Sequence, residues 1–301
     1  MKESTRFALR KHGWRIDRFI HHYLYFRFYY PYVKATIAIL PSLHYLRWFT
    51  PMGILGKAIF NRYHSKVLSS DDARKILSID EDIFAATEQN KQIIPFKYAH
   101  KIILKEADFI VVMDCPCKKS TGAPESSINS CLGVGRDVAS FWIEHCGKYS
   151  PRVITQDEAI ALIKTFRESG HITQAFFKVA TGGSTGVICN CHPDSCVSLI
   201  ATRLARKLDP GLSMTAESGY SVSHNTSVCK SCETCANTCQ FDAIEFNNGI
   251  WTYDKDHCLG CERCVESCPN LALSLYRDPE KTLPLDLDLV KERFLSNPGS
   301  S

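Results

Sequence analysis

Eight of the fifteen cysteines in this 301-residue chain form two identical runs near its carboxyl end. Each run has the spacing C-x2-C-x2-C-x3-C, and the second begins 29 residues after the first (258 − 229 = 29). The same offset carries Ala243 onto Ala272 and Ile244 onto Leu273. The repeat is therefore an internal duplication. Its members are Cys229, Cys232, Cys235 and Cys239, followed by Cys258, Cys261, Cys264 and Cys268.

This spacing is typical of iron-sulfur chemistry. Three thiolates gathered in one tight turn can bind one 4Fe-4S cube, and the fourth cysteine of the run then reaches the other cube. Zinc is the alternative, but a tetrahedral zinc site needs two separated pairs of thiolates and not four closely graded ones repeated twice. The rule predicts one cluster on Cys229, Cys232, Cys235 and Cys268, and a second on Cys258, Cys261, Cys264 and Cys239.

Residues 226–277, which contain both runs, resemble the bacterial two-cluster ferredoxins. The second run ends in Cys268-Pro269, as it does in that family, and each run is followed by an alanine and an aliphatic residue. The first run departs from the family at Gln240, where a proline usually pre-sets the backbone turn. The resemblance implies two low-potential 4Fe-4S clusters that carry single electrons between redox partners.

A second group of cysteines lies in the middle of the chain. The apolar run 109–113 predicts a buried strand that ends at Cys115 and Cys117, and a strand at 186–188 ends at Cys189 and Cys191. If the two strands are neighbours in one sheet, these four thiols converge. We therefore predict a third metal site, an iron-sulfur cluster with zinc as the alternative, and unligated buried cysteines as a third interpretation. Further candidate ligands are Cys196, Cys131 and His192.

Composition and patterning predict an α+β protein of several parts. The chain is 45% apolar and 23% charged, and this apolar content is enough to form hydrophobic cores. We expect a basic, aromatic helical segment at 1–66, a cysteine-rich α/β domain at 67–225, a ferredoxin-like domain at 226–280 and a tail at 281–301. Helices are predicted at 71–77, 96–106 and 155–168, and the polar stretch 221–227 is predicted to be a linker.

The first 66 residues are basic and aromatic. They hold 12 Lys and Arg against 2 Asp and Glu, and 15 of the 32 aromatic residues of the chain. A helix ending at Pro31 would place an aromatic face beside a basic stripe. Three interpretations fit this pattern: packing on the rest of the protein, binding to an anionic membrane surface, and docking to another subunit of a complex. No nucleic-acid-binding module is recognisable.

These features predict an electron-transfer protein or the electron-relay subunit of a redox complex. The alternative is an oxidoreductase whose substrate or catalytic metal lies at Cys115, Cys117, Cys189 and Cys191 and receives electrons from the two clusters. No catalytic residue can be assigned, so enzymatic activity stays open. An odd number of cysteines and a polar start without a secretory signal favour a cytoplasmic protein, and the membrane interpretation would place it on the inner face of the membrane.

Overall fold

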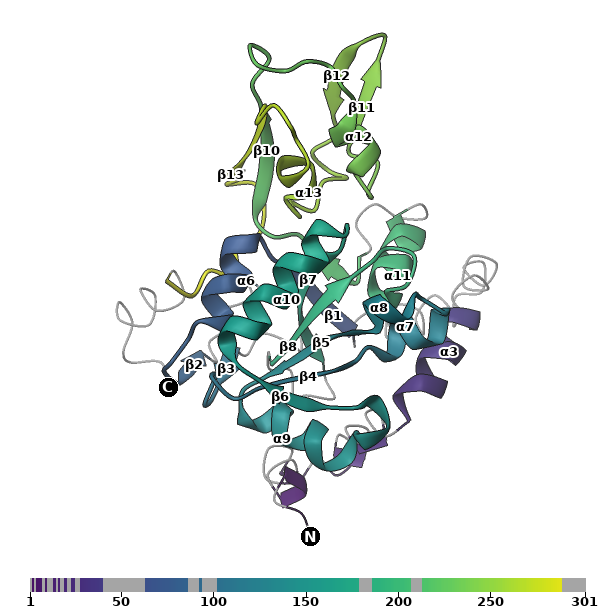
Figure 1. Ribbon diagram of the computed structural model, residues 1–301, viewed down its shortest axis with the longest axis vertical. Coiled ribbons are helices and arrows are strands. Elements are labelled where there is room, and N and C mark those ends of the chain that lie inside the picture. Colours follow the sequence, from purple (N-terminus) through teal and green to yellow (C-terminus); the bar gives the residue numbers. More distant parts are fainter. Residues whose placement is uncertain are drawn as a thin grey trace.

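A computed structural model shows an α/β body that carries a smaller lobe at one end (Figure 1). The structure describes residues 29–39, 63–85, 92–93, 102–178, 186–206 and 213–288, together with scattered residues between 2 and 28. The lobe comprises residues 220–277, and it contains both cysteine runs. The chain is thus α+β, as predicted.

The body is built on a seven-stranded sheet of order β6-β4-β5-β8-β7-β1-β9. Neighbouring strands are antiparallel, except for the parallel pair β1 and β9. The strands are β1 (Tyr63–Val67), β4 (Ile110–Asp114), β5 (Asn129–Val134), β6 (Arg152–Ile154), β7 (Ile172–Lys178), β8 (Val187–Cys191) and β9 (Thr215–Ala216).

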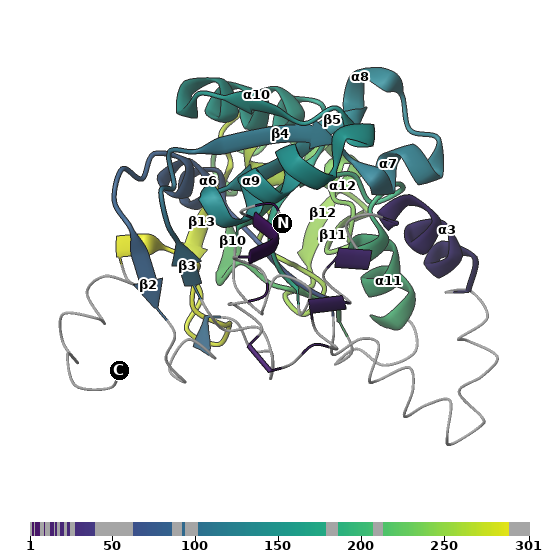
Figure 2. The same ribbon diagram turned by 90° about the horizontal axis from the view of Figure 1, so that it is seen from below.

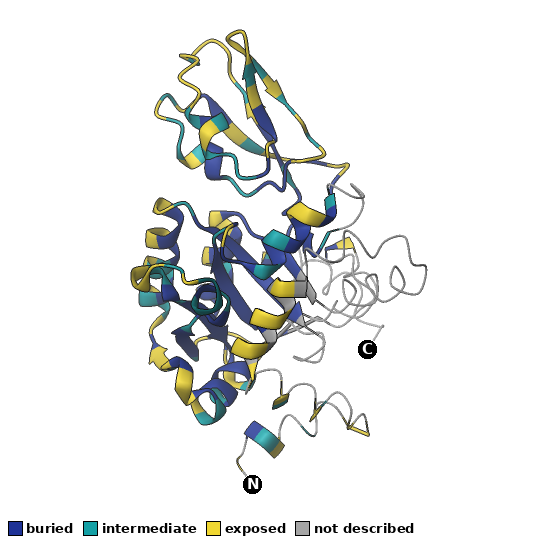
Figure 3. Ribbon diagram, turned by 90° about the vertical axis from the view of Figure 1, so that its right-hand side faces the viewer, coloured by how far each residue is buried: buried dark blue, intermediate teal, exposed yellow. Residues whose placement is uncertain are grey.

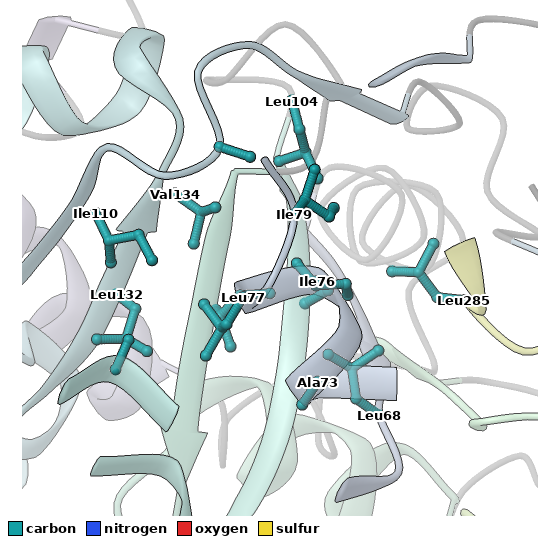
Figure 4. Packing of buried hydrophobic residues seen from close by; sticks show 14 of the residues in the cluster. Leu68, Ala73, Ile76, Leu77, Ile79, Leu104, Ile110, Leu132, Val134 and Leu285 are labelled. Atoms are coloured by element: carbon teal, nitrogen blue, oxygen red, sulfur yellow. The ribbon is translucent and has the colours of Figure 1, made fainter. Parts of the chain in front are cut away.

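Helices cover both faces of this sheet, because successive strand residues point to opposite sides. On one face, Ile110 and Leu132 pack in one cluster with Ile76 of α6 (Ser70–Leu77) (Figure 4). The cluster also includes Ile163 of α10 (Gln156–Glu168). On the other face, Val111 packs in a second core. That core includes residues of α3 (Tyr29–Ile39), α9 (Arg136–His145) and α11 (Val197–Arg206). Figure 3 shows the sheet as a buried layer between exposed helices.

Local capping signals account for the helices that were predicted correctly. The Ser69 hydroxyl accepts a hydrogen bond from the Asp72 amide at the start of α6, and Thr155 accepts one from the Glu158 amide at the start of α10. The helix predicted at 96–106 is wrong where the structure describes it, because residues 102–104 form a strand; residues 96–101 lie outside the described ranges. The remaining elements of the body are β2 (Ile83–Ala85), which pairs with β3 (Ile102–Leu104), and α7 (Pro116–Thr121), α8 (Glu125–Ile128) and η3 (Gly147–Tyr149).

The lobe consists of two short antiparallel strand pairs and two short helices. Strand β10 (Tyr220–His224) pairs with β13 (Leu273–Arg277), so the linker predicted at 221–227 is wrong for its first four residues. Ser221 and Val222 are both buried although three of these four residues are polar, so polar composition did not indicate an exposed linker here. The other elements are α12 (Thr234–Thr238), β11 (Ile244–Asn247), β12 (Ile250–Tyr253) and α13 (Arg263–Glu266).

After the lobe, the chain returns to the body. Leu285 and Leu287 are buried in the core beneath α6, and Asp286 forms an ion pair with Lys75 of that helix. The Leu283 amide donates a hydrogen bond to the Gln92 carbonyl. The first part of the predicted tail is therefore a component of the body core.

The described part of the N-terminal segment packs on the body. Helix α3 lies beside α7 (Figure 2), and it includes Pro31 in its first turn. Pro31 therefore lies in the first turn of a helix, which agrees with the tolerance of helix N-termini for proline. Among the described residues, no helix combines the length and apolar character needed to cross a membrane.

Candidate metal centres

The two cysteine runs have the same backbone conformation. Glu233 and Glu262, which are 29 residues apart, both adopt positive φ angles, of 60° and 71°. They precede α12 and α13, which begin at equivalent positions. The duplication seen in the sequence is therefore a structural duplication as well.

Equivalent backbone amides also point at equivalent sulfurs. The Ser231 amide donates to Cys229 Sγ at 3.4 Å, and the Gly260 amide donates to Cys258 Sγ at 3.3 Å. Two further donors, Ala243 and Ala272, repeat this pattern at the last cysteine of each run, at 3.4 and 3.3 Å. Such N–H···S contacts stabilise a thiolate, which is the form that binds metal.

One quartet of thiols lines a cavity at the outer side of the lobe. The empty volume of this cavity is about 300 Å³, which includes the open solvent at its mouth. Cys232 is exposed, and a hydrogen bond with the Thr234 hydroxyl lowers the pKa of this thiol. We call this the outer cavity; its cysteines are Cys229, Cys232, Cys235 and Cys268.

The other quartet lines a cavity of about 330 Å³ against the body. Leu259 and Phe241, which also line it, are buried in the same core as α9 and α11. Burial raises the pKa of the Cys261 thiol to about 12, so metal binding here would release a proton. We call this the inner cavity; its cysteines are Cys239, Cys258, Cys261 and Cys264.

Comparison with known proteins agrees with this geometry. Residues 228–272 match the family described as the 4Fe-4S dicluster domain. This segment is a 4Fe-4S dicluster domain. The match covers only part of the chain, and the rest of the body lies outside it.

Two relatives of the dicluster domain are named for iron-sulfur or electron-transport roles. A protein of Proteus vulgaris, named as a probable iron-sulfur subunit of the Frd operon, is 43% identical over 63 residues, which are 20% of this chain and 40% of that protein. The "Electron transport protein HydN" of Escherichia coli is 36% identical over 63 residues, which are 20% of this chain and 35% of that protein. The chain thus spans less than half the length of either relative.

The departure of the dicluster domain from the ferredoxin pattern at Gln240 has a structural reason. The Gln240 side-chain amide donates a hydrogen bond of 2.8 Å to the Gly170 carbonyl, just after α10 of the body. A proline could not make this contact. Gln240, which follows Cys239, therefore forms a hydrogen bond between the dicluster domain and the body.

The cysteines of the body gather on one face of the sheet, but not as predicted. Strands β4 and β8 are not neighbours, because β5 lies between them and pairs with both. Cys131 is therefore in the middle of a strand, opposite Cys189, and the two sulfurs are 3.6 Å apart. Cys131, which the sequence indicated only as a further candidate ligand, therefore lies between the strands that carry the two predicted cysteine pairs.

Six thiols form a continuous row on this face. Cys115 lies within hydrogen-bonding reach of Cys117 and Cys131, and Cys191 of Cys189 and Cys196. Burial raises the pKa of Cys191 well above its usual range. We call this group the thiol row; in contact order it runs through Cys117, Cys115, Cys131, Cys189, Cys191 and Cys196.

The candidate ligand His192 and the remaining thiol, Cys146, lie apart from this contact order. His192 instead faces Asp194, with Nδ1 3.6 Å from the carboxylate, and its ring centroid is 5.5 Å from that of His171. Cys146 is buried in the same core at the end of α9. Across the described ranges, no three Cys, His, Asp or Glu side chains already have an arrangement that could hold a metal ion, so binding would require the thiols to rearrange.

Proposed function

We propose that this chain is an electron-transfer protein or the electron-relay subunit of a redox complex. The observation that supports this most strongly is that each cysteine quartet predicted from the spacing lines a cavity of its own. We assign one 4Fe-4S cluster to the outer cavity and one to the inner cavity. When bound, the clusters supply one-electron chemistry, and the chain contributes thiolate ligands, N–H···S hydrogen bonds and exclusion of water.

The two cavities suggest an order for the relay. The outer cavity includes the exposed Cys232, whereas residues of the inner cavity are buried against the body. An external redox partner would reach the outer cluster first, and the inner cluster would connect it to the body. We therefore expect the partner to dock on the side of the lobe that carries the outer cavity, away from the body.

We propose that the thiol row is the third metal site, with Cys131 as a central ligand beside Cys115, Cys117, Cys189 and Cys191. Cys131 contacts two other members of the row, which supports this change from the four ligands predicted first. The 3.6 Å between Cys131 and Cys189 is close to the edge of a zinc tetrathiolate, about 3.8 Å for Zn–S bonds of about 2.3 Å. A 4Fe-4S cluster would need the thiols to spread apart. Zinc therefore needs the smaller rearrangement of the thiols, and metal analysis distinguishes it from a cluster.

Metal analysis of protein purified without oxygen tests these assignments. About eight irons per chain would support the two clusters of the dicluster domain, and about twelve would add a cluster at the thiol row. About eight irons with one zinc would make the row a zinc site. Folded protein without iron would rule out the relay.

The size of the thiol row favours a second candidate function, an oxidoreductase that uses the row as its active site. The row has six thiols where four ligands suffice, and an open coordination position could hold a substrate. Its burial under α9 and α11 favours the relay instead. Cyanide is a suitable probe, because it would change the spectrum of an open iron site and leave a fully ligated one unchanged.

We further propose that the N-terminal segment binds an anionic membrane surface. Ile16, Ile20 and Leu24 are spaced four residues apart and are exposed, in a segment with an excess of ten positive charges. Replacing these three residues with serine should abolish sedimentation with anionic vesicles, and the wild type should not sediment with neutral ones. Equal sedimentation of variant and wild type would exclude this face as the contact.

A further inference from the structure

Arg167 of the body reaches across to the dicluster domain. It lies in the last turn of α10, and its side chain is only 3% exposed. Its Nε donates a hydrogen bond to Glu266 Oε1 at 2.5 Å, and Nη2 donates to the Cys261 carbonyl at 3.0 Å. Nη2 is also 3.4 Å from a carboxylate oxygen of Glu262. A buried guanidinium thus contacts the backbone of a residue that lines the inner cavity.

The outer cavity has a different environment. Subtracting 29 from Cys261 gives Cys232, which is exposed, and subtracting 29 from Arg263, a buried residue of the inner cavity, gives Thr234. The inner side also has Lys281, which is largely buried and donates to the Cys258 carbonyl at 2.6 Å. Two similar sets of ligands are therefore placed in unequal electrostatic surroundings.

The physical consequence concerns the charge of the cluster. Reduction adds one negative charge, and a cation fixed in a region of low dielectric favours the reduced form. A carboxylate at the same place opposes reduction. Because only 3% of the Arg167 side chain is exposed, salt screens the effect of its charge less than it screens surface charges, whereas the Glu266 side chain is 27% exposed and is screened more.

We propose that Arg167 is a positioning residue that raises the reduction potential of the inner cluster relative to the outer one. This inference depends on the proposed assignment of a cluster to the inner cavity. Glu266 acts on the same cluster in the opposite direction. The body thereby sets the potential of one of the two clusters across the domain boundary.

The same side chain also connects the inner cavity with the thiol row. Arg167 Nη1 is 3.5 Å from the Thr173 hydroxyl, which is 3.4 Å from Asn190 Oδ1. Asn190 stands between Cys189 and Cys191 in β8. A buried hydrogen-bond path therefore runs from the Cys261 backbone through Arg167 to the strand that carries two thiols of the row.

A redox titration followed by electron paramagnetic resonance tests this role in the full-length, anaerobically purified protein. Arg167→Gln should lower the midpoint potential of one cluster by roughly 59 mV, a tenfold change in a one-electron equilibrium, and leave the other cluster unchanged. Glu266→Gln should raise the potential of the same cluster. Arg167→Lys keeps the positive charge, so the midpoint potential of this cluster should stay close to its wild-type value.

The control is Lys230→Gln, which removes an exposed charge between two outer ligands and should have a small effect because of screening. If Arg167→Gln loses its inner cluster, Glu266→Gln and Arg167→Lys still provide the measurement. Unchanged potentials in the Arg167 and Glu266 variants, or shifts in the same direction, would overturn the inference. Wild-type protein without clusters would instead overturn the proposed function.

Discussion

Cys264 lies in the core of the lobe, where it lines the inner cavity together with the other three cysteines of its quartet. Serine has nearly the same size but binds iron poorly, so Cys264→Ser should remove one cluster and leave the other. We expect the iron content to fall from about eight to about four atoms per chain. The matched control is Cys146→Ser, which changes a buried thiol outside both quartets and should keep all the iron. Equal iron in both variants would contradict the assignment of Cys264.

Lys66 makes a pH-dependent contribution to stability at the base of the lobe. Its side chain is buried and donates to the Glu217 carbonyl at 2.7 Å. Burial lowers the pKa of Lys66 to about 7. The unfolded chain therefore binds more protons between about pH 7 and 10, so stability should rise with pH in this range.

Comparison with Lys66→Met isolates this contribution. At pH 7 the wild type still carries most of the free-energy penalty for burying this amine, and at pH 9 it carries about half of it. The thermal midpoint of the variant, relative to wild type, should therefore be higher at pH 7 than at pH 9. A difference that is independent of pH would show that Lys66 has the same pKa in both states.

At the scale of elements, the two cysteine loops differ in one glycine. Gly260 has a φ of 65°, and a Cβ there would lie 2.2 Å from Ser218 Oγ and 2.4 Å from the Tyr220 carbonyl oxygen. The equivalent residue of the other loop is Ser231, which has a φ of 49° and carries a side chain. Close packing against β10 therefore makes glycine necessary only in the inner loop.

Gly260→Ala should consequently disrupt the inner loop, with a cost of about 1–3 kcal/mol for the backbone strain and more for the contact. We expect a lower thermal midpoint and loss of about four irons. Ser231→Ala, the matched control, should change the midpoint little. Similar results for both variants would mean that Gly260 is not confined by its neighbours.

The helices and strands also show which features of this protein its sequence could predict. Ligand spacing and helix caps depend on residues a few positions apart, so the dicluster domain, α6 and α10 were predictable. The central place of Cys131 depends on β5 pairing between β4 and β8, which are far apart in the chain. The contacts of Arg167 and Gln240 with residues of the other part of the molecule are equally non-local. No local pattern indicates them.

At the scale of the whole molecule, body and lobe are stabilised differently. Among the described residues, the core of the body under α6 and α10 is mostly aliphatic and contains no cysteine, whereas the small core of the lobe includes Cys235, Cys258 and Cys264. Removing iron with a chelator should therefore unfold the lobe and leave this side of the body intact. Hydrogen exchange should show lost protection in β10 and β13 and retained protection in β4 and β7. Loss of protection in both parts would show that they unfold as one unit.

The chain enters and leaves the lobe through one pair of strands. Tyr220 is paired with Arg277, and Leu285 and Leu287 then complete the core of the body. The iron-sulfur domain is thus inserted into the chain of the body, and its first and last residues are neighbours. Such an insertion can be exchanged during evolution without changing the fold of the body. The side chains that contact it across the boundary, Arg167 and Gln240 among them, would have to change with it.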